Sequence, residues 1–218
     1  MQPIRIFFKK EGRAKYISHL DLNRVMQRAL RRACIPVWRT QGFNPHPYIA
    51  FGLPLSLFYE SDCEVMDARL DGDMSLSEVK KRLSEQMPEG IEITAVKRPE
   101  HKLTDICFAS YQLSLEFDGM AKKDLEDMLS KVMSNEQIII EKKTKHRTVE
   151  LDVKKYFESA DIVVSDGLIR IDVTVPAGPT ENLNPAFFAT AFEKYGVKPD
   201  FENVRRLRLL TKDMNIFS

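Results

Sequence analysis

Cysteine is scarce in this chain, and its spacing excludes several classes of site. The three cysteines are Cys34, Cys63 and Cys107, and no two of them have the C-x-x-C spacing of zinc sites, redox pairs or many iron–sulfur clusters. We therefore expect buried free thiols, no metal site and no cofactor. The chain also has no cluster motif with which to start radical chemistry by itself.

Long apolar runs and a large net charge are also missing. No stretch approaches the roughly 18 apolar residues of a membrane span, and the first residues alternate like a strand instead of forming a signal-peptide core. We expect a cytoplasmic protein with no membrane partner. The formal net charge of +1 argues against a uniformly basic nucleic-acid protein, so any affinity for phosphate must come from local clusters of basic residues.

Signatures of a self-sufficient enzyme are absent as well. The sequence has no glycine-rich phosphate loop, no Ser-His-Asp order and no recognisable nucleophile motif. Its 218 residues, 43% hydrophobic and 30% charged, are ordinary for a globular protein and suffice for two domains of about 100 residues. We therefore read the chain as a binding or accessory protein first and an enzyme second.

The first half of the chain predicts the order of a βαββαβ unit. Ser18 is expected to cap a helix whose apolar residues recur at helical spacing, and Pro36 ends it. The remaining elements are strands over residues 4–8, 37–40, 48–51, 63–70 and 91–96 and a second helix over residues 76–87.

The second half predicts the same order. Its expected elements are strands over residues 111–117, 138–141, 162–165, 168–175 and 204–210 and helices over residues 121–133 and 185–195, with Asn184 as a cap of the last helix. The predicted fold is α+β, with two tandem ferredoxin-like (βαββαβ) units, each an antiparallel sheet with its helices on one face. We expect domains at residues 1–99 and 105–218, joined by a linker at residues 99–104.

A run of arginines marks one face of the first predicted helix. These side chains lie opposite the apolar stripe because they recur at spacings of three and four residues, and Arg39 on the next segment extends the group. The set is Arg24, Arg28, Arg31, Arg32 and Arg39. The face is either a solvated helix surface or a surface that binds phosphate or RNA, for which arginine supplies forked donors.

The segment QGFNPHPY at residues 41–48 is the least ordinary in the chain. Two prolines restrict its backbone, and its glycine permits a tight turn. A rigid loop of this kind holds polar and aromatic side chains in place at little entropic cost, which favours a recognition role over a plain turn. The recognition residues that we assign are Gln41, Phe43, Asn44 and His46, together with Glu64 from a later strand.

Two histidines are candidates for acid–base chemistry. His19 at the start of the first helix and His46 in the loop could share proton transfer if they lie at the same edge of the sheet. Neither has a diagnostic metal spacing, so no metal site is assigned. Two further basic groups, at residues 142–147 and 205–208, are either solvated charge or a second phosphate contact.

The motifs resemble those of the radical-SAM-linked protein family of bacteria. The resemblance rests on YISHLDL at residues 16–22, the pair Arg31-Arg32, TQGFNPHP at residues 40–47, and Pro54-Leu55 followed by Glu60-Ser61 and Glu64. In that family the domain stands beside, or is fused to the C-terminus of, a radical S-adenosylmethionine (SAM) protein, and its function is uncharacterised. The resemblance implies a radical SAM partner and an RNA or ribosome context.

Three functions follow as hypotheses. The first is an accessory protein that binds RNA or a ribosome-associated substrate for a partner radical SAM enzyme. The second is a small endoribonuclease or metal-assisted enzyme that uses His19 and His46. The third is a protein-binding module that docks through Phe58-Tyr59. In all three we expect residues 18–32 and 41–64 to form one continuous patch, with Asn44 or His46 near Ser18 and Glu64 reaching in.

Overall fold

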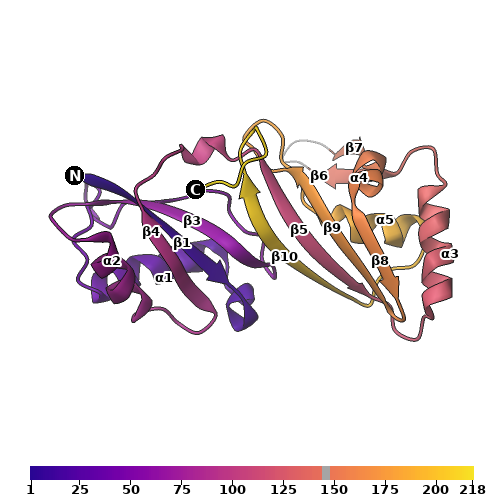
Figure 1. The fold of residues 1–218 in the computed structure, drawn as a ribbon, viewed down its shortest axis with the longest axis horizontal. Coiled ribbons are helices and arrows are strands. Elements are labelled where there is room, and N and C mark those ends of the chain that lie inside the picture. Colours follow the sequence, from indigo (N-terminus) through magenta and orange to yellow (C-terminus); the bar gives the residue numbers. More distant parts are fainter. Residues whose placement is uncertain (144–147) are drawn as a thin grey trace. The chain divides into compact units, whose positions relative to one another are not determined.

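The computed structural model describes residues 1–143 and 148–218 as a mixed α/β fold whose sheet is mostly antiparallel (Figure 1). The chain divides into two compact units. Unit 1 comprises Met1–Phe108, Ala177–Pro179 and Arg206–Ser218, and unit 2 comprises Ala109–Pro176 and Thr180–Arg205. Compared with the expected ranges 1–99 and 105–218, unit 1 also takes in the end of the chain.

Unit 1 carries its two α-helices on one face of its strands (Figure 1). Its elements are β1 (Gln2–Lys10), the 3-10 helix η1 (Gly12–Tyr16), α1 (His19–Arg32), β2 (Ile49–Phe51), β3 (Glu60–Leu70), α2 (Leu76–Ser84), β4 (Ile91–Lys97) and the 3-10 helix η2 (Leu103–Asp105). The strand order is β4-β1-β3 with β2 paired to β3, and all three pairings are antiparallel. The part of β10 from Arg206 onward belongs to unit 1 and lies next to β3 in the sheet.

Unit 2 has the strand order β10-β5-β9-β8 and a separate two-stranded sheet of β6 and β7. Its elements are β5 (Phe108–Glu116), α3 (Lys122–Met133), β6 (Ile139–Lys143), β7 (Thr148–Asp152), α4 (Lys154–Ser159), β8 (Asp161–Ser165), β9 (Leu168–Pro176), α5 (Phe187–Tyr195) and β10 (Phe201–Leu210). The sequence did not predict β7 or the six-residue helix α4, and α4 is too short to show a helical period.

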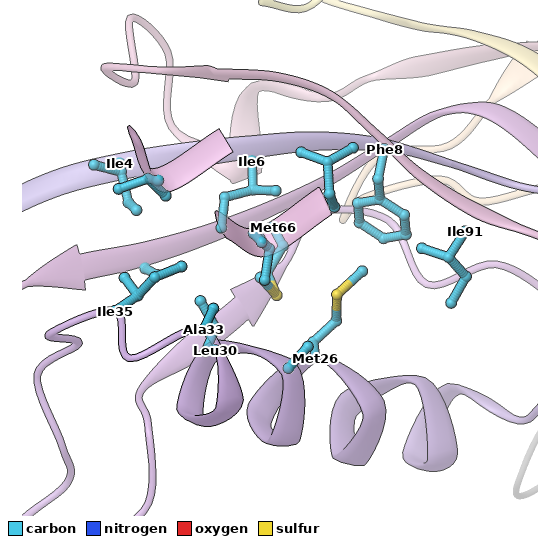
Figure 2. Close-up of a cluster of buried hydrophobic side chains, with 14 of the residues drawn as sticks. Ile4, Ile6, Phe8, Met26, Leu30, Ala33, Ile35, Met66 and Ile91 are labelled. Atoms are coloured by element: carbon cyan, nitrogen blue, oxygen red, sulfur yellow. The ribbon is translucent and has the colours of Figure 1, made fainter. Parts of the chain in front are cut away.

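The core of unit 1 lies between its strands and α1 (Figure 2). Ile4, Ile6 and Phe8 alternate along β1, so all three point to the same side of the sheet. Met26 and Leu30 recur four residues apart on α1, which places them one above the other on the face that meets those strands. All five side chains are fully buried, and their burial is the main force that fixes α1 against the sheet.

The opposite face of the β1–β3 pair is covered by the expected linker and by the end of the chain. Arg5 is completely buried there and donates two hydrogen bonds, of 2.7 and 3.0 Å, to the Asp67 carboxylate. Its other donors reach the main-chain oxygens of His101 at 2.8 Å and Ser218 at 3.2 Å, and the Phe217 ring lies 4.6 Å from its guanidinium carbon. These contacts explain why the chain's last residues belong to unit 1.

Unit 2 has an aromatic core that the sequence pattern only partly indicated. Phe157 of α4 lies with its ring centroid 4.4 Å from that of Phe188 and 6.0 Å from that of Phe192, both on α5. Phe192 also meets Phe117 at 6.0 Å. The unpredicted helix α4 therefore contributes a buried ring to this core.

Several predicted boundaries differ from the observed ones. Residues 37–40 do not form a strand. They make only two isolated bridges, between Val37 and Leu70 and between Arg39 and Pro47. The last helix begins at Phe187, although Asn184 does accept a hydrogen bond from the Ala186 amide at 3.0 Å. Within residues 1–143 and 148–218, no helix is both long and apolar enough to cross a membrane.

Candidate nucleic-acid interface

Residues 37–48 form a hairpin-like projection, which we call the arm. Its two sides are joined by hydrogen bonds from the Thr40 amide to the His46 oxygen at 2.9 Å and from the Tyr48 amide to the Trp38 oxygen at 3.0 Å. The Trp38 amide donates to the Arg69 oxygen at 2.8 Å, which attaches the arm to the end of β3. The arm is thus an ordered extension of unit 1.

The tip of the arm is held by its own side chains. His46 Nδ1 lies 3.2 Å from Thr40 Oγ1 and 3.0 Å from the main-chain oxygen of Asn44, while the His46 amide donates to Thr40 Oγ1 at 3.3 Å. Gly42 has a φ of 147°, in the region that favours glycine. Phe43 beside it is fully exposed. The tip therefore presents an uncovered aromatic ring on a constrained backbone.

The base of the arm carries an aromatic pair next to a cation. The Trp38 and Tyr48 rings meet edge to face with centroids 5.5 Å apart, and the Arg69 guanidinium carbon lies 5.6 Å from the Tyr48 centroid. Tyr48 and Arg69 are exposed, whereas Trp38 is half-buried. Such a mixture of exposed rings and guanidinium groups suits the stacking of unpaired bases beside a phosphate backbone.

The predicted arginine face of α1 is exposed along its whole length. Arg24 pairs with Asp21 at 2.9 Å, and Arg32 donates to the main-chain oxygen of Gln86 at 2.8 Å. In the part of the chain that the structure describes, the remaining members of the group have no salt-bridge partner. These are Arg28, Arg31 and Arg39.

The start of α1 is formed as predicted. Ser18 is the N-cap residue and its hydroxyl accepts from the Asp21 amide at 3.1 Å. Hydrogen bonds from Ser18 and from Arg24 lower the pKa of the Asp21 carboxyl. Asp21 is therefore engaged in capping the helix and pairing with its neighbour, which is a structural role.

The arm lies at the opposite end of the sheet from the predicted position. The bridge between Val37 and Leu70 puts it at the C-terminal end of β3, where α1 ends. Ser18 lies at the other end, where the loop after β2 returns and the Phe58 amide donates to the Lys15 oxygen. The prediction of one continuous patch is wrong, because the connection from α1 to β2 must leave from the end of the helix.

The two histidines are consequently not brought together. The His19 ring lies 5.0 Å from the Phe51 ring at the end of β2, whereas His46 contacts Thr40 in the arm. Five residues of extended chain separate His46 from Phe51, which span roughly 16 Å. This arrangement does not support shared proton transfer, which requires direct or single-water reach.

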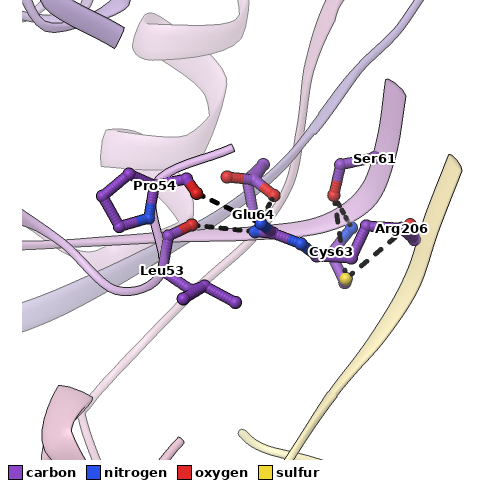
Figure 3. A network of polar contacts seen from close by, with 6 residues as sticks. All are labelled: Leu53, Pro54, Ser61, Cys63, Glu64 and Arg206. Atoms are coloured by element: carbon purple, nitrogen blue, oxygen red, sulfur yellow. Dashed lines mark hydrogen bonds and ion pairs between the residues drawn. The ribbon is translucent and has the colours of Figure 1, made fainter. Parts of the chain in front are cut away.

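Glu64 is not at a surface. It is buried, and Arg206 of β10, also buried, donates to its Oε1 at 2.8 Å. Arg206 further donates to the main-chain oxygens of Leu53 at 2.8 Å and Pro54 at 3.2 Å, as Figure 3 shows. The assignment of Glu64 to the recognition loop is therefore wrong. Its partner Arg206 is 142 residues away in the sequence, so no local pattern indicated the pair.

Two more ionisable groups belong to this buried network. Lys10 is buried, donates to the Ile17 oxygen at 3.3 Å and has a lowered pKa because it is desolvated, an effect that the Glu64 charge opposes. Burial also raises the pKa of the Cys63 thiol to about 12, and the neighbouring Glu64 adds to this. The Cys63 amide donates to Ser61 Oγ at 3.2 Å (Figure 3). The network is thus a structural charge cluster beside a half-buried thiol whose pKa is raised.

The other predicted groups also contain both exposed and buried residues. Arg208 is exposed, but Arg206 is buried, so residues 205–208 do not form a solvated basic group. Cys34 is exposed, contrary to the expected buried thiol, and Cys107 is partly exposed. Lys145, His146 and Arg147 lie outside the described residues. Among described residues, no group of three or more His, Cys, Asp or Glu side chains could hold a metal ion.

Comparisons with known proteins identify a family for this chain but no function. The model of a family described as "Uncharacterized protein conserved in bacteria (DUF2344)" matches residues 3–185. No curated protein matches the chain. A chain of the solved structure "Crystal Structure of a Cbf5-Nop10-Gar1 Complex" is similar at a TM-score of 0.49 and 12% identity. The similarity covers 94% of the present chain and 48% of that one, and it supports no functional argument.

Proposed function

We propose that this chain, which belongs to the uncharacterised bacterial family DUF2344, is a non-catalytic accessory protein that binds single-stranded RNA through the arm. The observation that carries the proposal is the fully exposed Phe43 ring on the constrained tip of the arm, together with the Trp38–Tyr48–Arg69 group at the base of the same arm. Exposed aromatic rings stack on unpaired bases whatever their sequence, and guanidinium groups contact the phosphates.

The arginines of α1 extend this surface for phosphate contact. Arg28 and Arg31 lie on the exposed face of the helix that leads into the arm, and Arg39 lies within the arm itself. Because they are exposed and without salt-bridge partners among the described residues, a phosphate backbone can replace water around them without breaking an ion pair. Gln41, Asn44 and His46 supply hydrogen-bonding groups for base edges next to Phe43.

The partner and the setting are part of the same proposal. We infer, from the resemblance of the motifs to the radical-SAM-linked family, that the bound RNA or a ribosome-associated substrate is presented to a separate radical SAM enzyme in the cytoplasm. A pull-down with a neighbouring radical SAM protein, analysed for co-purifying RNA, tests this part. Recovery of the enzyme without RNA would favour a protein-binding role.

We also propose that the units are two ferredoxin-like units in tandem. Unit 1 has the strand order β4-β1-β3-β2, and unit 2 has the order β10-β5-β9-β8. Along the chain, each set of four strands gives a βαββαβ series, with one helix between its first two strands and one between its last two. Both observations support this assignment. In this reading the β6–β7 sheet and α4 are insertions in the second unit. An experimental structure of either unit tests the assignment directly.

RNA binding is best tested with the full chain and a fluorescent, unstructured oligouridine probe, by anisotropy at several salt concentrations. Phe43→Ala should weaken binding by roughly 5- to 150-fold, because base–aromatic stacking contributes about 1 to 3 kcal/mol per base. Arg13→Ala, an exposed arginine in η1 at the opposite end of the β1–β3 pair, is the matched control. Equal affinity of the wild type and Phe43→Ala, or no measurable affinity at low salt, would overturn the proposal.

A further inference from the structure

His46 is an exposed side chain on a backbone that has little conformational freedom. Asn44 and His46 each precede a proline, and Pro45 and Pro47 restrict the residue before them to extended conformations. Pro47 is itself buried, whereas His46 is exposed. The imidazole is therefore offered to solvent from a fixed point of the arm.

The contacts of Nδ1 decide which nitrogen of the His46 ring carries the proton. The main-chain oxygen of Asn44 lies 3.0 Å from Nδ1. A carbonyl oxygen only accepts, so a hydrogen bond between these two atoms requires a proton on Nδ1. Thr40 Oγ1, 3.2 Å from the same nitrogen, is also able to accept, because its own proton can point to the His46 oxygen at 3.5 Å. In the neutral ring, Nε2 is then left with a lone pair.

Nε2 of His46 is consequently an acceptor of fixed polarity. In the described part of the chain, no residue hydrogen-bonds to it. The carboxamides of Gln41 and Asn44 differ in this respect, because each carries both donors and an acceptor and can present either one by rotating. A ligand group that pairs with Nε2 must therefore be a donor.

The donors of RNA bases lie where base pairing uses them. Each base has at least one N–H on its Watson–Crick edge, and in a duplex this group is already bonded to the opposite strand. An unpaired base that stacks on an aromatic side chain leaves the same edge free for the protein. An acceptor near such a ring thus distinguishes bases by whether their N–H is free.

We propose that His46 selects unpaired bases with an unmodified Watson–Crick N–H, which Nε2 accepts while the base stacks on Phe43. This inference rests on the proposed RNA function and names its ligand class, since paired bases and bases methylated at that nitrogen cannot make the bond. Phe43 supplies affinity for any base, and His46 adds the selection. Thr40 and the Asn44 carbonyl act as positioning groups that keep the proton on Nδ1.

The test compares two fluorescent probes of equal length, oligouridine and oligo(N3-methyluridine), by anisotropy with the full chain. Uracil has a single N–H, and N3-methylation removes it but keeps the ring and the phosphates. At about pH 8, above the usual titration range of histidine, the wild type should bind oligouridine about 3- to 10-fold more tightly, the ratio that one hydrogen bond supplies. His46→Phe, which keeps a flat ring without an acceptor, should bind both probes equally. His19→Phe, at the other end of unit 1, should keep the wild-type ratio.

The affinity of His46→Phe for the methylated probe separates selection from a structural role, and we expect it not to fall below that of the wild type. A fall would show that His46 only holds the tip together, and would overturn the inference. Equal affinity of the wild type for both probes, or a preference that His46→Phe retains, would also overturn it and leave the RNA proposal intact. No affinity for either probe would overturn the RNA proposal and this inference together.

Discussion

Arg206 and Arg39 both belong to unit 1 but occupy opposite environments. Arg206 is buried, pairs with Glu64 and holds two main-chain oxygens, whereas Arg39 projects from the arm into solvent. A buried guanidinium loses its hydration and must have every donor satisfied, so its role is to fix the chain around it. An exposed guanidinium keeps its donors available for a ligand. Residue type alone therefore does not distinguish structure from binding, but environment does.

Breaking the buried pair should produce the largest effect. Glu64→Ala leaves Arg206 uncompensated in the interior, and removal of one member of a buried ion pair costs about 3 to 5 kcal/mol. Urea denaturation of the full chain measures the loss. Arg208→Ala, two residues from Arg206 on the same strand but exposed, should change the unfolding free energy by less than about 0.5 kcal/mol.

The double variant Glu64→Leu with Arg206→Met sharpens this comparison. Replacing both members by apolar residues of similar size should cost less than either single change, because no charge is left buried without a partner. If the double variant loses as much as the sum of the two single variants, the pair is not coupled and the buried network does not act as a unit.

The exposed Cys34 and the less exposed Cys63 allow the same comparison of environments through a chemical reaction. Because the Cys63 pKa is raised to about 12 from a usual value of 9.0, its thiolate at neutral pH is about a thousandfold scarcer than that of an ordinary thiol. Brief treatment with iodoacetamide should therefore label the exposed Cys34 in the folded protein and leave Cys63 unmodified until urea is added. Peptide mass spectrometry reads out both sites. Labelling of Cys63 at the rate of Cys34 in the native protein would contradict the buried network.

Salt dependence tests the exposed arginines. If Arg28, Arg31 and Arg39 contact phosphates, replacing each by Ala should reduce the slope of log affinity against log salt by about 0.7 for a single strand. Stability should change by less than about 0.5 kcal/mol, since these side chains are exposed and make no salt bridge among the described residues. Arg13→Ala, at the opposite end of the β1–β3 pair, should leave the slope unchanged. Identical slopes for all four variants would remove these arginines from the interface.

The pH dependence of stability tests Lys10. Its folded pKa lies below 10.5 because burial disfavours the charged amine, so the unfolded chain binds more protons in the window between the lowered value and pH 10.5. Stability should consequently rise with pH through that window. Lys10→Met should reduce this rise, whereas Lys9→Met, which is partly exposed, should keep it. Urea denaturation from neutral pH to pH 10.5 measures both slopes, and equal slopes would show that Lys10 is well solvated.

Local interactions account for what could be predicted. The cap at Ser18, the buried stripe of Met26 and Leu30 and the alternation along β1 were all readable, because they depend on residues a few positions apart. The arginine face of α1 was readable for the same reason. The constrained loop at residues 41–47 was also recognisable from its prolines and glycine, although the side on which it lies was not.

What the sequence by itself determined is the order of most helices and strands, the apolar faces that they bury and the residue types at the arm's tip. Only the tertiary structure decided which charges are buried and which segments meet. Arg206 reaches Glu64 across 142 residues, and Arg5 reaches the Ser218 oxygen across 213. No local pattern encodes such pairs, since their partners are selected by strand pairing and by the need to satisfy every buried donor.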